Sequence, residues 1–254
     1  MYYDALLKKA GKVVKEQGPL ALAGKALNYL SPIVYSPVLL LKIGSFNNRS
    51  TVKEMVDFLF SKAGGIIRPA QVPFEIQSLV EKVKVLEPER IMEIGTNRGG
   101  TLFLFSKVSS ENAAIISVDL PGGEFGYGYP AWKIPLFKSF ASKNQEMHLI
   151  RADSHAKETF LQVEKILKGK KLDFLFIDGD HTYDGVKKDF EAYSKLVRKG
   201  GLIAFHDIVK HPASTGCEVD IFWKELKRKK GKNASEIVES KRQKYAGIGI
   251  IKAA

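Results

Sequence analysis

A segment with acidic and histidine side chains, FIDGDHTYDG at residues 176–185, follows an apolar run in the 254-residue chain. Its candidate functional side chains are Asp178, Asp180, His181 and Asp184. Carboxylates bind divalent metals, and an imidazole can accept a proton near neutral pH. Such a cluster can activate a weakly acidic hydroxyl group, either with a base or with a metal that stabilises the developing alkoxide. The alternative interpretation is a solvated polar turn.

A glycine-rich segment, EIGTNRGG at residues 93–100, follows a second apolar run. Glycines at such a position permit a tight turn and let the backbone approach a ligand closely. The spacing is not the G-x-G-x-x-G of dinucleotide sites, and Glu93 would repel a pyrophosphate, so NAD is disfavoured. A carboxylate instead suits a cationic ligand, such as the sulfonium and ammonium groups of S-adenosylmethionine. The candidate contacts are Glu93, Gly95, Thr96, Asn97 and Gly99.

Three other apolar runs also end in polar side chains. Asp119 ends one run and can accept hydrogen bonds from the two ribose hydroxyls of a nucleoside. Asp153 and Ser154 end the next and can border an adenine. His206 and Asp207 end the last of them, so they can converge with the acidic segment at neighbouring strand ends.

These side chains need a scaffold that brings strand ends together. From about residue 73 onward, strand-like and helix-like segments alternate, which is the pattern of a parallel sheet covered by helices. The expected strands are 90–94, 114–118, 148–151, 172–177, 201–206, 235–240 and 246–252, and the expected helices are 73–86, 101–108, 157–169, 186–199 and 219–229. The sequence thus predicts a Rossmann-like, doubly wound α/β fold with seven strands, in which ligands bind beyond the carboxyl ends of the strands.

The expected helix over 186–199 follows directly after the acidic segment. Asp184 is its expected N-cap, and Gly200 or Gly201 is its expected C-terminal stop. Its apolar face comprises Val186, Phe190, Tyr193 and Val197. In this interpretation residues 183–185 form only a turn into the helix.

The ordered series MEIGTNRGG, SVDL, RADS, LDFLFIDGDHTYDG and RKGGLIAFHD resembles the motifs of class I S-adenosylmethionine-dependent methyltransferases. The resemblance covers residues 71–254 and implies a mostly parallel sheet whose last strand, in AGIGIIK, is antiparallel. FIDGDHTYDGVKKD and the insert PGGEFGYGY are most similar to the branch of cephalosporin hydroxylase-type and macrocin O-methyltransferase-type proteins. Catechol O-methyltransferase is a more distant relative of that branch. The resemblance implies transfer of a methyl group to an oxygen.

The resemblance also implies roles for individual positions. Gly95 and Gly99 would shape the loop around the methionine moiety, preceded by the acidic Glu93. Asp119 would hold the ribose, and Asp153 and Ser154 would border the adenine.

In the metal-dependent relatives, the positions of Asp178, His206 and Asp207 hold a magnesium ion. An acidic residue is commoner at position 206, so the histidine either turns away or favours manganese, iron or zinc. His181 matches the catalytic lysine of the catechol enzymes and is the candidate base, with Asp180 as a group that could orient it. Whether a metal or His181 takes the acceptor's proton stays open, and magnesium or manganese is the expected metal.

The insert GGEFGYGYPAWKIP, residues 122–135, is rich in glycine and aromatic residues. This composition is typical of a mobile lid that excludes water and stacks on a ring. Tyr127, Tyr129 and Trp132 are the candidate acceptor contacts, and His211 could also reach the site. Ordinary loop packing is the alternative for these aromatic residues.

The first 70 residues are expected to form a helical appendage to a methyltransferase domain at 71–254. Apolar stretches that carry lysines are interrupted there at Pro19, Pro32 and Pro37. The appendage can pack on the sheet domain, mediate dimerisation or rest on a membrane surface through its basic helices. A homo-oligomer is expected.

Lysine and arginine outnumber aspartate and glutamate by 40 to 28, which gives a net charge of +12. A basic surface attracts nucleic acid, anionic lipid or acidic small molecules alike. The run KRKK at 227–230 is interpreted as the solvated end of an amphipathic helix. The fourth strand lacks the Asn-Pro-Pro-Tyr or Asp-Pro-Pro-Tyr box that many base-amine methyltransferases carry. A nucleic-acid methyltransferase is therefore the second hypothesis, and no stable nucleic-acid partner is expected.

The leading hypothesis is a metal-assisted O-methyltransferase that uses S-adenosylmethionine and acts on a sugar, a glycan or a glycosylated small molecule. An NAD-dependent oxidoreductase is the third hypothesis. The single cysteine, Cys217, excludes an internal disulfide and is expected to exclude a cysteine-based zinc site. No secretory signal opens the chain, so a cytoplasmic protein is expected. The apolar stretches fall short of the roughly 20 residues that a membrane-spanning helix needs.

Overall fold

The computed structural model describes residues 15, 37–47, 49–61, 64–126 and 128–254. The chain forms two compact units, residues 1–42 and residues 43–254. The proline-interrupted basic helices expected in the first 36 residues lie outside the described residues, apart from the helical Lys15. In the described part of the chain, no helix is long and apolar enough to cross a membrane. The domain boundary expected near residue 70 stays a prediction.

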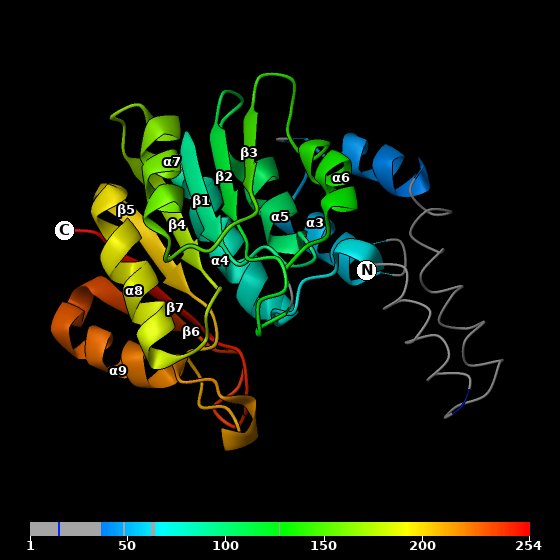
Figure 1. Cartoon of the computed structure of the whole chain (residues 1–254). Coiled ribbons are helices and arrows are strands. Elements are labelled where there is room, and N and C mark those ends of the chain that lie inside the picture. The colour runs from blue at the N-terminus through cyan, green and yellow to red at the C-terminus, as the bar shows by residue number, and fades with distance from the viewer. Residues whose placement is uncertain (1–14, 16–36, 48, 62–63, 127) are drawn as a thin grey trace. The chain divides into compact units, whose positions relative to one another are not determined.

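The second unit contains a seven-stranded sheet with the order β3-β2-β1-β4-β5-β7-β6 (Figure 1). Its strands are β1 (Arg90–Ile94), β2 (Ala114–Val118), β3 (Glu146–Ile150), β4 (Leu172–Ile177), β5 (Val197–Phe205), β6 (Ala234–Ile237) and β7 (Ile248–Lys252). Neighbours among β1 to β5 pair in parallel, and β7 is antiparallel to both β5 and β6. The predicted fold class is confirmed, including the antiparallel last strand.

Helices cover both faces of the sheet (Figure 1). They are α3 (Val52–Phe60), α4 (Pro73–Leu86), α5 (Gly100–Val108), α6 (Ile134–Lys138), α7 (Lys157–Leu167), α8 (Tyr183–Tyr193) and α9 (Val219–Lys230). Every residue of β4 is buried, and its side chains alternate between the two faces. Leu175 joins the core under α7, α8 and α9, whereas the rings of Phe174 and Phe176 pack edge-on against Phe105 of α5.

Strand register decides which residues meet at the carboxyl edge of the sheet. Ile177 of β4 pairs with Ile94 of β1 and with Phe205 of β5. The next residues along these strands are therefore neighbours: Gly95, Asp178 and His206. The glycine loop and the acidic segment are thus brought together by backbone pairing alone.

The helix after the acidic segment starts earlier than expected. Its N-cap is Thr182, whose hydroxyl accepts a hydrogen bond from the backbone N–H of Gly185 at 3.0 Å. The predicted cap, Asp184, was wrong, because this carboxylate lies in the first helical turn, where negative charge still suits the helix dipole. Asp180 selects Thr182 by accepting hydrogen bonds from its backbone N–H at 2.9 Å and its hydroxyl at 2.8 Å.

The end of this helix also differs from the prediction. α8 stops at Tyr193, a short 3-10 turn follows, and Val197 begins β5 instead of completing the helical face. The expected helix stops, Gly200 and Gly201, lie inside β5. Gly200 lies in the first half of β5, before the regular pairing with Phe174 and the later residues of β4 begins. Its φ of 77° is a conformation that glycine adopts readily, which explains why a glycine stands at this position.

A buried glutamate on α4 fixes the loop that precedes β7. Glu75 is fully buried and accepts hydrogen bonds from the backbone N–H groups of Gly247 at 2.8 Å and Glu239 at 3.1 Å, and from the side chain of Gln243 at 2.7 Å. Ala246, in the same loop, accepts a hydrogen bond from the backbone N–H of Val209. Glu75 thereby holds the loop next to the segment that follows β5.

Lys133 is a buried cation beside the first turn of the glycine-loop helix. Its side-chain nitrogen lies 3.4 Å from the carbonyl oxygen of Arg98 and 3.5 Å from that of Ile66. No described carboxylate forms an ion pair with it. Burial, together with the charge of Arg98, lowers the pKa of Lys133 to about 8. Folding therefore carries an electrostatic cost at this position.

We expect Lys133→Met to raise the free energy of unfolding at pH 7 by roughly 1–3 kcal/mol. The cost of the native lysine is fully present below its folded pKa of about 8, because the unfolded chain keeps the proton until pH 10.5. The gain should therefore shrink as the pH rises from 8 to 10.5. Urea unfolding at pH 7 and near pH 10 measures both effects. Lys138→Met, at an exposed position on α6, is the control, and an equal gain at both pH values would contradict the explanation.

Candidate active site

A cavity of about 800 Å³ opens at the carboxyl edge of the sheet. Its wall is formed by the glycine loop after β1, by the residues that follow β2, β3, β4 and β5, and by two further segments, 69–71 and 123–126. This volume lies within the range of roughly 300–1,000 Å³ that is usual for small-molecule sites. The position agrees with the predicted ligand site beyond the strand ends.

The glycine loop has a conformation that other residues would not permit. Gly95 has a φ of 88°, and a Cβ atom there would overlap the backbone carbonyl oxygen of Asp178. Gly99 has a φ of 89° and lies against the ring of Phe137. Asn97 is also left-handed, with a φ of 45°. The glycines therefore let the loop lie directly on the end of β4.

Asp119 fixes this loop from the neighbouring strand end. Its Oδ2 atom accepts hydrogen bonds from the backbone N–H groups of Asn97 at 2.8 Å and Tyr129 at 3.2 Å. Burial raises the pKa of Asp119, and these backbone donors oppose the rise. Asp153 and Ser154 also line the cavity, where Asp153 accepts from the backbone N–H of His155 at 2.8 Å. All three predicted nucleoside contacts thus border one cavity.

Glu93 lies behind the loop rather than in the cavity wall. It is fully buried, and the hydroxyl of Thr96 donates to its Oε2 atom at 2.9 Å. Burial raises the pKa of Glu93 to about 8, so the carboxyl is mostly protonated at neutral pH. Direct contact of this side chain with a cationic ligand stays a prediction from the sequence.

An ion cluster occupies the ends of β4 and β5. His206 Nδ1 lies 3.1 Å from Asp178 Oδ1 and 3.3 Å from Asp207 Oδ1. All three side chains are largely buried, and Asp207 has a φ of 61°, which is uncommon outside glycine and is found preferentially at functional sites. The three predicted metal ligands thus come together at one point.

Two further imidazoles contact the same carboxylates. The ring nitrogens of His181 lie 3.4 Å from Asp178 Oδ1 and 3.3 Å from Asp207 Oδ2. His211 Nε2 lies 3.2 Å from Asp207 Oδ1, while its Nδ1 lies 2.8 Å from the carbonyl oxygen of Val209. His181 lines the cavity, whereas His211 is not among the residues of its wall.

Charge pairing sets the ionisation of this cluster. Burial favours the neutral form of every member, but the mutual attraction of carboxylate and imidazolium outweighs it. The pKa of Asp178 and that of Asp207 are therefore lowered, and the pKa of His206 is raised well above its usual value. His181 and His211 also have raised pKa values. At neutral pH the cluster holds paired opposite charges.

The donor chemistry of the cluster fits a divalent metal. Asp178, His206 and Asp207 each offer one ligand atom, and the three atoms lie within 4.8 Å of one another. His206 Nδ1 lies between the two carboxylates, where its proton supplies part of the positive charge that a divalent metal would supply. The Nε2 atom of His206 is buried and has no hydrogen-bond partner among the described residues. Two oxygen donors and one nitrogen donor suit manganese or iron better than magnesium.

Two cavity residues gave no signal in the sequence. Gln71 donates from its side-chain amide to Asp178 Oδ2 at 2.6 Å, across a separation of 107 residues. The ring of Phe125 stacks on His181 with 4.8 Å between ring centroids. Gln71 stands in a proline-flanked segment with no motif, and Phe125 belongs to the aromatic insert, whose composition alone does not show which of its rings reaches the cavity.

The predicted acceptor contacts have different positions. Tyr127 lies outside the described residues. Tyr129 is buried, and its ring packs edge-on against Phe137. Trp132 is 53% exposed, and neither Tyr129 nor Trp132 lines the cavity. Their contact with an acceptor stays a prediction.

Comparison with known proteins adds a family match. Residues 92–208, a little under half of the chain, match a family model described as a methyltransferase domain. The uncharacterized protein y4gI of Sinorhizobium fredii is 29% identical over 147 residues, which cover 57% of this chain and 16% of that protein. Tapetum-specific methyltransferase 1 of Arabidopsis thaliana is 25% identical over 156 residues, which cover 61% of each chain. The chain thus spans less than two thirds of the length of these relatives.

Among solved structures, the O-methyltransferase of Bacillus cereus in complex with S-adenosylhomocysteine has a similar fold. Its TM-score is 0.53 at 21% identity, and the match covers 80% of this chain and 90% of that one. Identity at this level supports the fold alone. Residues 92–208 therefore match the methyltransferase-domain family within a fold that an O-methyltransferase of known structure shares.

Proposed function

We propose that this protein is an S-adenosylmethionine-dependent O-methyltransferase, with a hydroxyl of a sugar, a glycan or a glycosylated small molecule as the acceptor. The observation that carries the proposal is a single cavity bordered by two sites. One is the nucleoside site formed by the glycine loop, Asp119 and Ser154, and the other is the ion cluster around Asp178. A methyl donor and an activated oxygen can therefore meet without either leaving the cavity. The family match of residues 92–208 supports the same conclusion.

Methyl transfer to oxygen is a single displacement. The acceptor oxygen forms a bond to the methyl carbon, the bond from that carbon to the sulfonium sulfur breaks, and the sulfur leaves as a neutral thioether. The hydroxyl proton must also leave, because a neutral aliphatic hydroxyl is a weak nucleophile. The protein's task is thus to align the two reactants and to accept a proton.

His181 is the side chain best placed to accept that proton. It lines the cavity, and Phe125 covers one face of its ring. Both ring nitrogens face carboxylates, which against the effect of burial raise the pKa of His181. One of these contacts must therefore be released, and the ring must be in its neutral form, before the imidazole can accept the proton of an acceptor hydroxyl. Gln71 holds Asp178 through the oxygen that does not face His181, which keeps this carboxylate in place when the imidazole contact opens.

Asp178, His206 and Asp207 would hold a divalent metal, which would supply positive charge for the oxygen anion that develops on the acceptor.

We further propose that the chain belongs to the cephalosporin hydroxylase-type and macrocin O-methyltransferase-type branch, on the strength of its FIDGDHTYDG segment. The acceptor class follows from that resemblance. Gly126, packed against Asn97, lets the aromatic insert approach the donor site closely.

We expect S-adenosylhomocysteine to bind the wild-type protein, and Asp119→Ala to weaken that binding about 10- to 100-fold, because a ribose hydroxyl loses a charged acceptor. Isothermal titration calorimetry measures both affinities. Asp184→Ala, which removes an exposed carboxylate from the first turn of α8, should bind like the wild type. Absence of binding by folded wild-type protein would overturn the proposed function, and tight binding of NAD in the same titration would favour an oxidoreductase.

Manganese binding should depend on the ion cluster. We expect Asp178→Asn to reduce Mn²⁺ affinity at least about tenfold, because one of two carboxylate ligands is lost. The electron paramagnetic resonance signal of free Mn²⁺, followed during a protein titration, reports the bound fraction. Asp153→Asn changes a carboxylate that lines the cavity outside the cluster and should leave the titration unchanged. Equal affinity of wild type and Asp178→Asn would remove the metal from the proposal.

His181→Ala should lower turnover roughly 10²- to 10⁴-fold, the usual contribution of a general base, while S-adenosylhomocysteine affinity changes little. A panel of sugar and glycoside acceptors with a radiolabelled methyl donor first identifies a substrate, and calorimetry supplies the affinity. His148→Ala is the control, since this imidazole lies on β3 beside Glu146 and outside the cavity. Similar losses in turnover and affinity would assign His181 to binding instead of proton transfer.

A further inference from the structure

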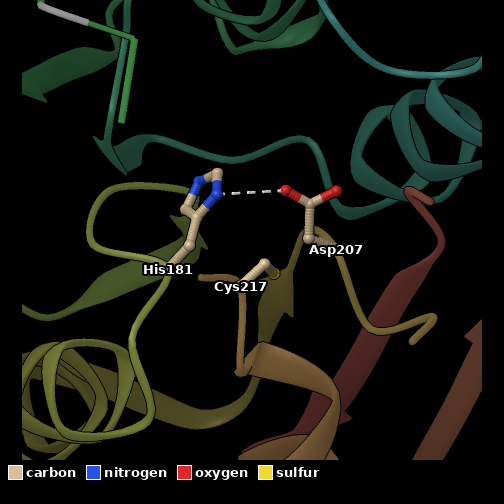
Figure 2. A group of neighbouring side chains, drawn as sticks. All are labelled: His181, Asp207 and Cys217. Atoms are coloured by element: carbon tan, nitrogen blue, oxygen red, sulfur yellow. Dashed lines mark ion pairs between the residues drawn. The ribbon is translucent and has the colours of Figure 1, made fainter. Parts of the chain in front are cut away.

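The chain's single cysteine lies beside the candidate base. Cys217 is partly buried in the loop that precedes α9, 36 residues after His181 in the sequence. His181, Asp207 and Cys217 each offer one ligand atom, and these three atoms lie within 4.8 Å of one another. Figure 2 shows the three side chains, with the His181–Asp207 ion pair above the sulfur of Cys217. This group has a nitrogen, an oxygen and a sulfur donor.

Backbone contacts fix the three donors relative to one another. The backbone N–H of Glu218 donates to the carbonyl oxygen of His181 at 2.8 Å, and the carboxylate of Glu218 accepts from the backbone N–H of Tyr183 at 3.1 Å. The residue after Cys217 is thus bonded to the residues on either side of Thr182, the N-cap of α8. Asp207 is fixed separately, by its position at the end of β5. The cluster is therefore part of the folded framework.

The two oxygens of Asp207 point to different groups. Oδ1 faces His206 and His211, whereas Oδ2 lies 3.3 Å from His181 Nδ1. A cation held through Oδ2 would therefore contact the opposite side of this carboxylate from the cation that Asp178 and His206 would hold. The two groups share Asp207 but differ in every other ligand.

The donor set selects a thiophilic ion. Magnesium and calcium prefer oxygen ligands, whereas zinc takes sulfur, nitrogen and oxygen in a tetrahedral arrangement with bonds of about 2.0–2.3 Å. Such bonds place neighbouring ligand atoms roughly 3–4 Å apart. The existing spacing of at most 4.8 Å needs only small side-chain rotations to reach this value. Water or an acceptor oxygen would complete the fourth position.

We propose that His181, Asp207 and Cys217 form a second cation site, specific for zinc or a similarly thiophilic divalent ion. The bound ion coordinates a ring nitrogen of His181, the candidate base. Binding at this site needs no assumption about the reaction. Its consequence, inhibition of methyl transfer through loss of His181, rests on the proposed function.

The thiol is suited to metal-dependent ionisation. Burial raises the pKa of Cys217 to about 11, so the group is a neutral thiol at pH 7. A coordinated divalent ion deprotonates a thiol outright. Free thiol and metal-bound thiolate are therefore distinct states that spectroscopy can separate.

Cobalt and zinc titrations of the full-length wild type and of Cys217→Ser test the site. Cobalt, as a stand-in for zinc, should give a sulfur-to-metal charge-transfer band in the near ultraviolet with the wild type, and Cys217→Ser should lack it. Because the chain has one cysteine, such a band can arise only from Cys217. Competition with a chromophoric chelator should show zinc affinity at least about tenfold weaker for Cys217→Ser, whereas Mn²⁺ affinity stays the same.

The proposal fails if cobalt gives no thiolate band, or if zinc binds both proteins equally. Zinc binding that is lost in Asp178→Asn but kept in Cys217→Ser would place the ion on Asp178, His206 and Asp207 instead. S-adenosylhomocysteine calorimetry on the same samples separates the two proposals. Normal binding of that ligand without a thiolate band leaves the methyltransferase standing, whereas a band without ligand binding leaves the cation site standing.

Discussion

The pairing of two buried carboxylates with one buried imidazole is the constraint on which the site depends. The side chains of Asp178 and Asp207 are 13% and 10% exposed, and that of His206 is 5% exposed. Unpaired carboxylates at this depth would be driven to protonate, whereas the shared His206 Nδ1 keeps both ionised. Because β4 and β5 pair in parallel register up to Ile177 and Phe205, the sheet holds the backbone positions that carry these charges side by side. The fold therefore keeps two carboxylates and the imidazolium that pairs with them close together at its carboxyl edge.

The same strand end also positions the donor side of the cavity. Gly95 lies against the backbone of Asp178, because β1 and β4 are neighbours and no Cβ atom separates the loop from the strand. Asp119 then fixes the loop from β2 through the backbone N–H of Asn97. The glycine loop is thus held by close packing on the end of one neighbouring strand and by a hydrogen bond to a carboxylate at the end of the other. A loop that was free to move would give up the alignment that a single-displacement reaction requires.

Much of this arrangement could be predicted from the sequence, since short apolar runs bounded by glycine and acidic residues mark buried strands and their ligand-binding ends. β1, β2 and β4 begin and end where expected, and so does α4. The start of α8 could not be predicted, because Thr182 and Asp184 are both good caps by type, and the hydrogen bonds that Thr182 donates to the carboxylate of Asp180 decide between them. Gln71 and Cys217 reach the site through long-range packing that leaves no periodic pattern or motif. The position of Tyr129 could not be predicted either, because an insert rich in glycine and aromatic residues is typical of a lid, and its composition does not show that this ring is buried against Phe137.

His206 changes what the cluster can do without a metal. In the relatives that the sequence resembles, this position is more often acidic, and three converging carboxylates repel one another until a divalent cation binds. Here a proton on His206 already offsets part of the charge of Asp178 and Asp207, so the cluster is compatible with a stable fold without a bound cation. A metal must then displace that proton, which lowers the apparent affinity for any ion and favours ions that accept nitrogen ligands. Metal binding at this cluster therefore depends on release of the proton from His206. Since His206 contacts only Oδ1 of Asp207, the Oδ2 atom can face His181 and Cys217.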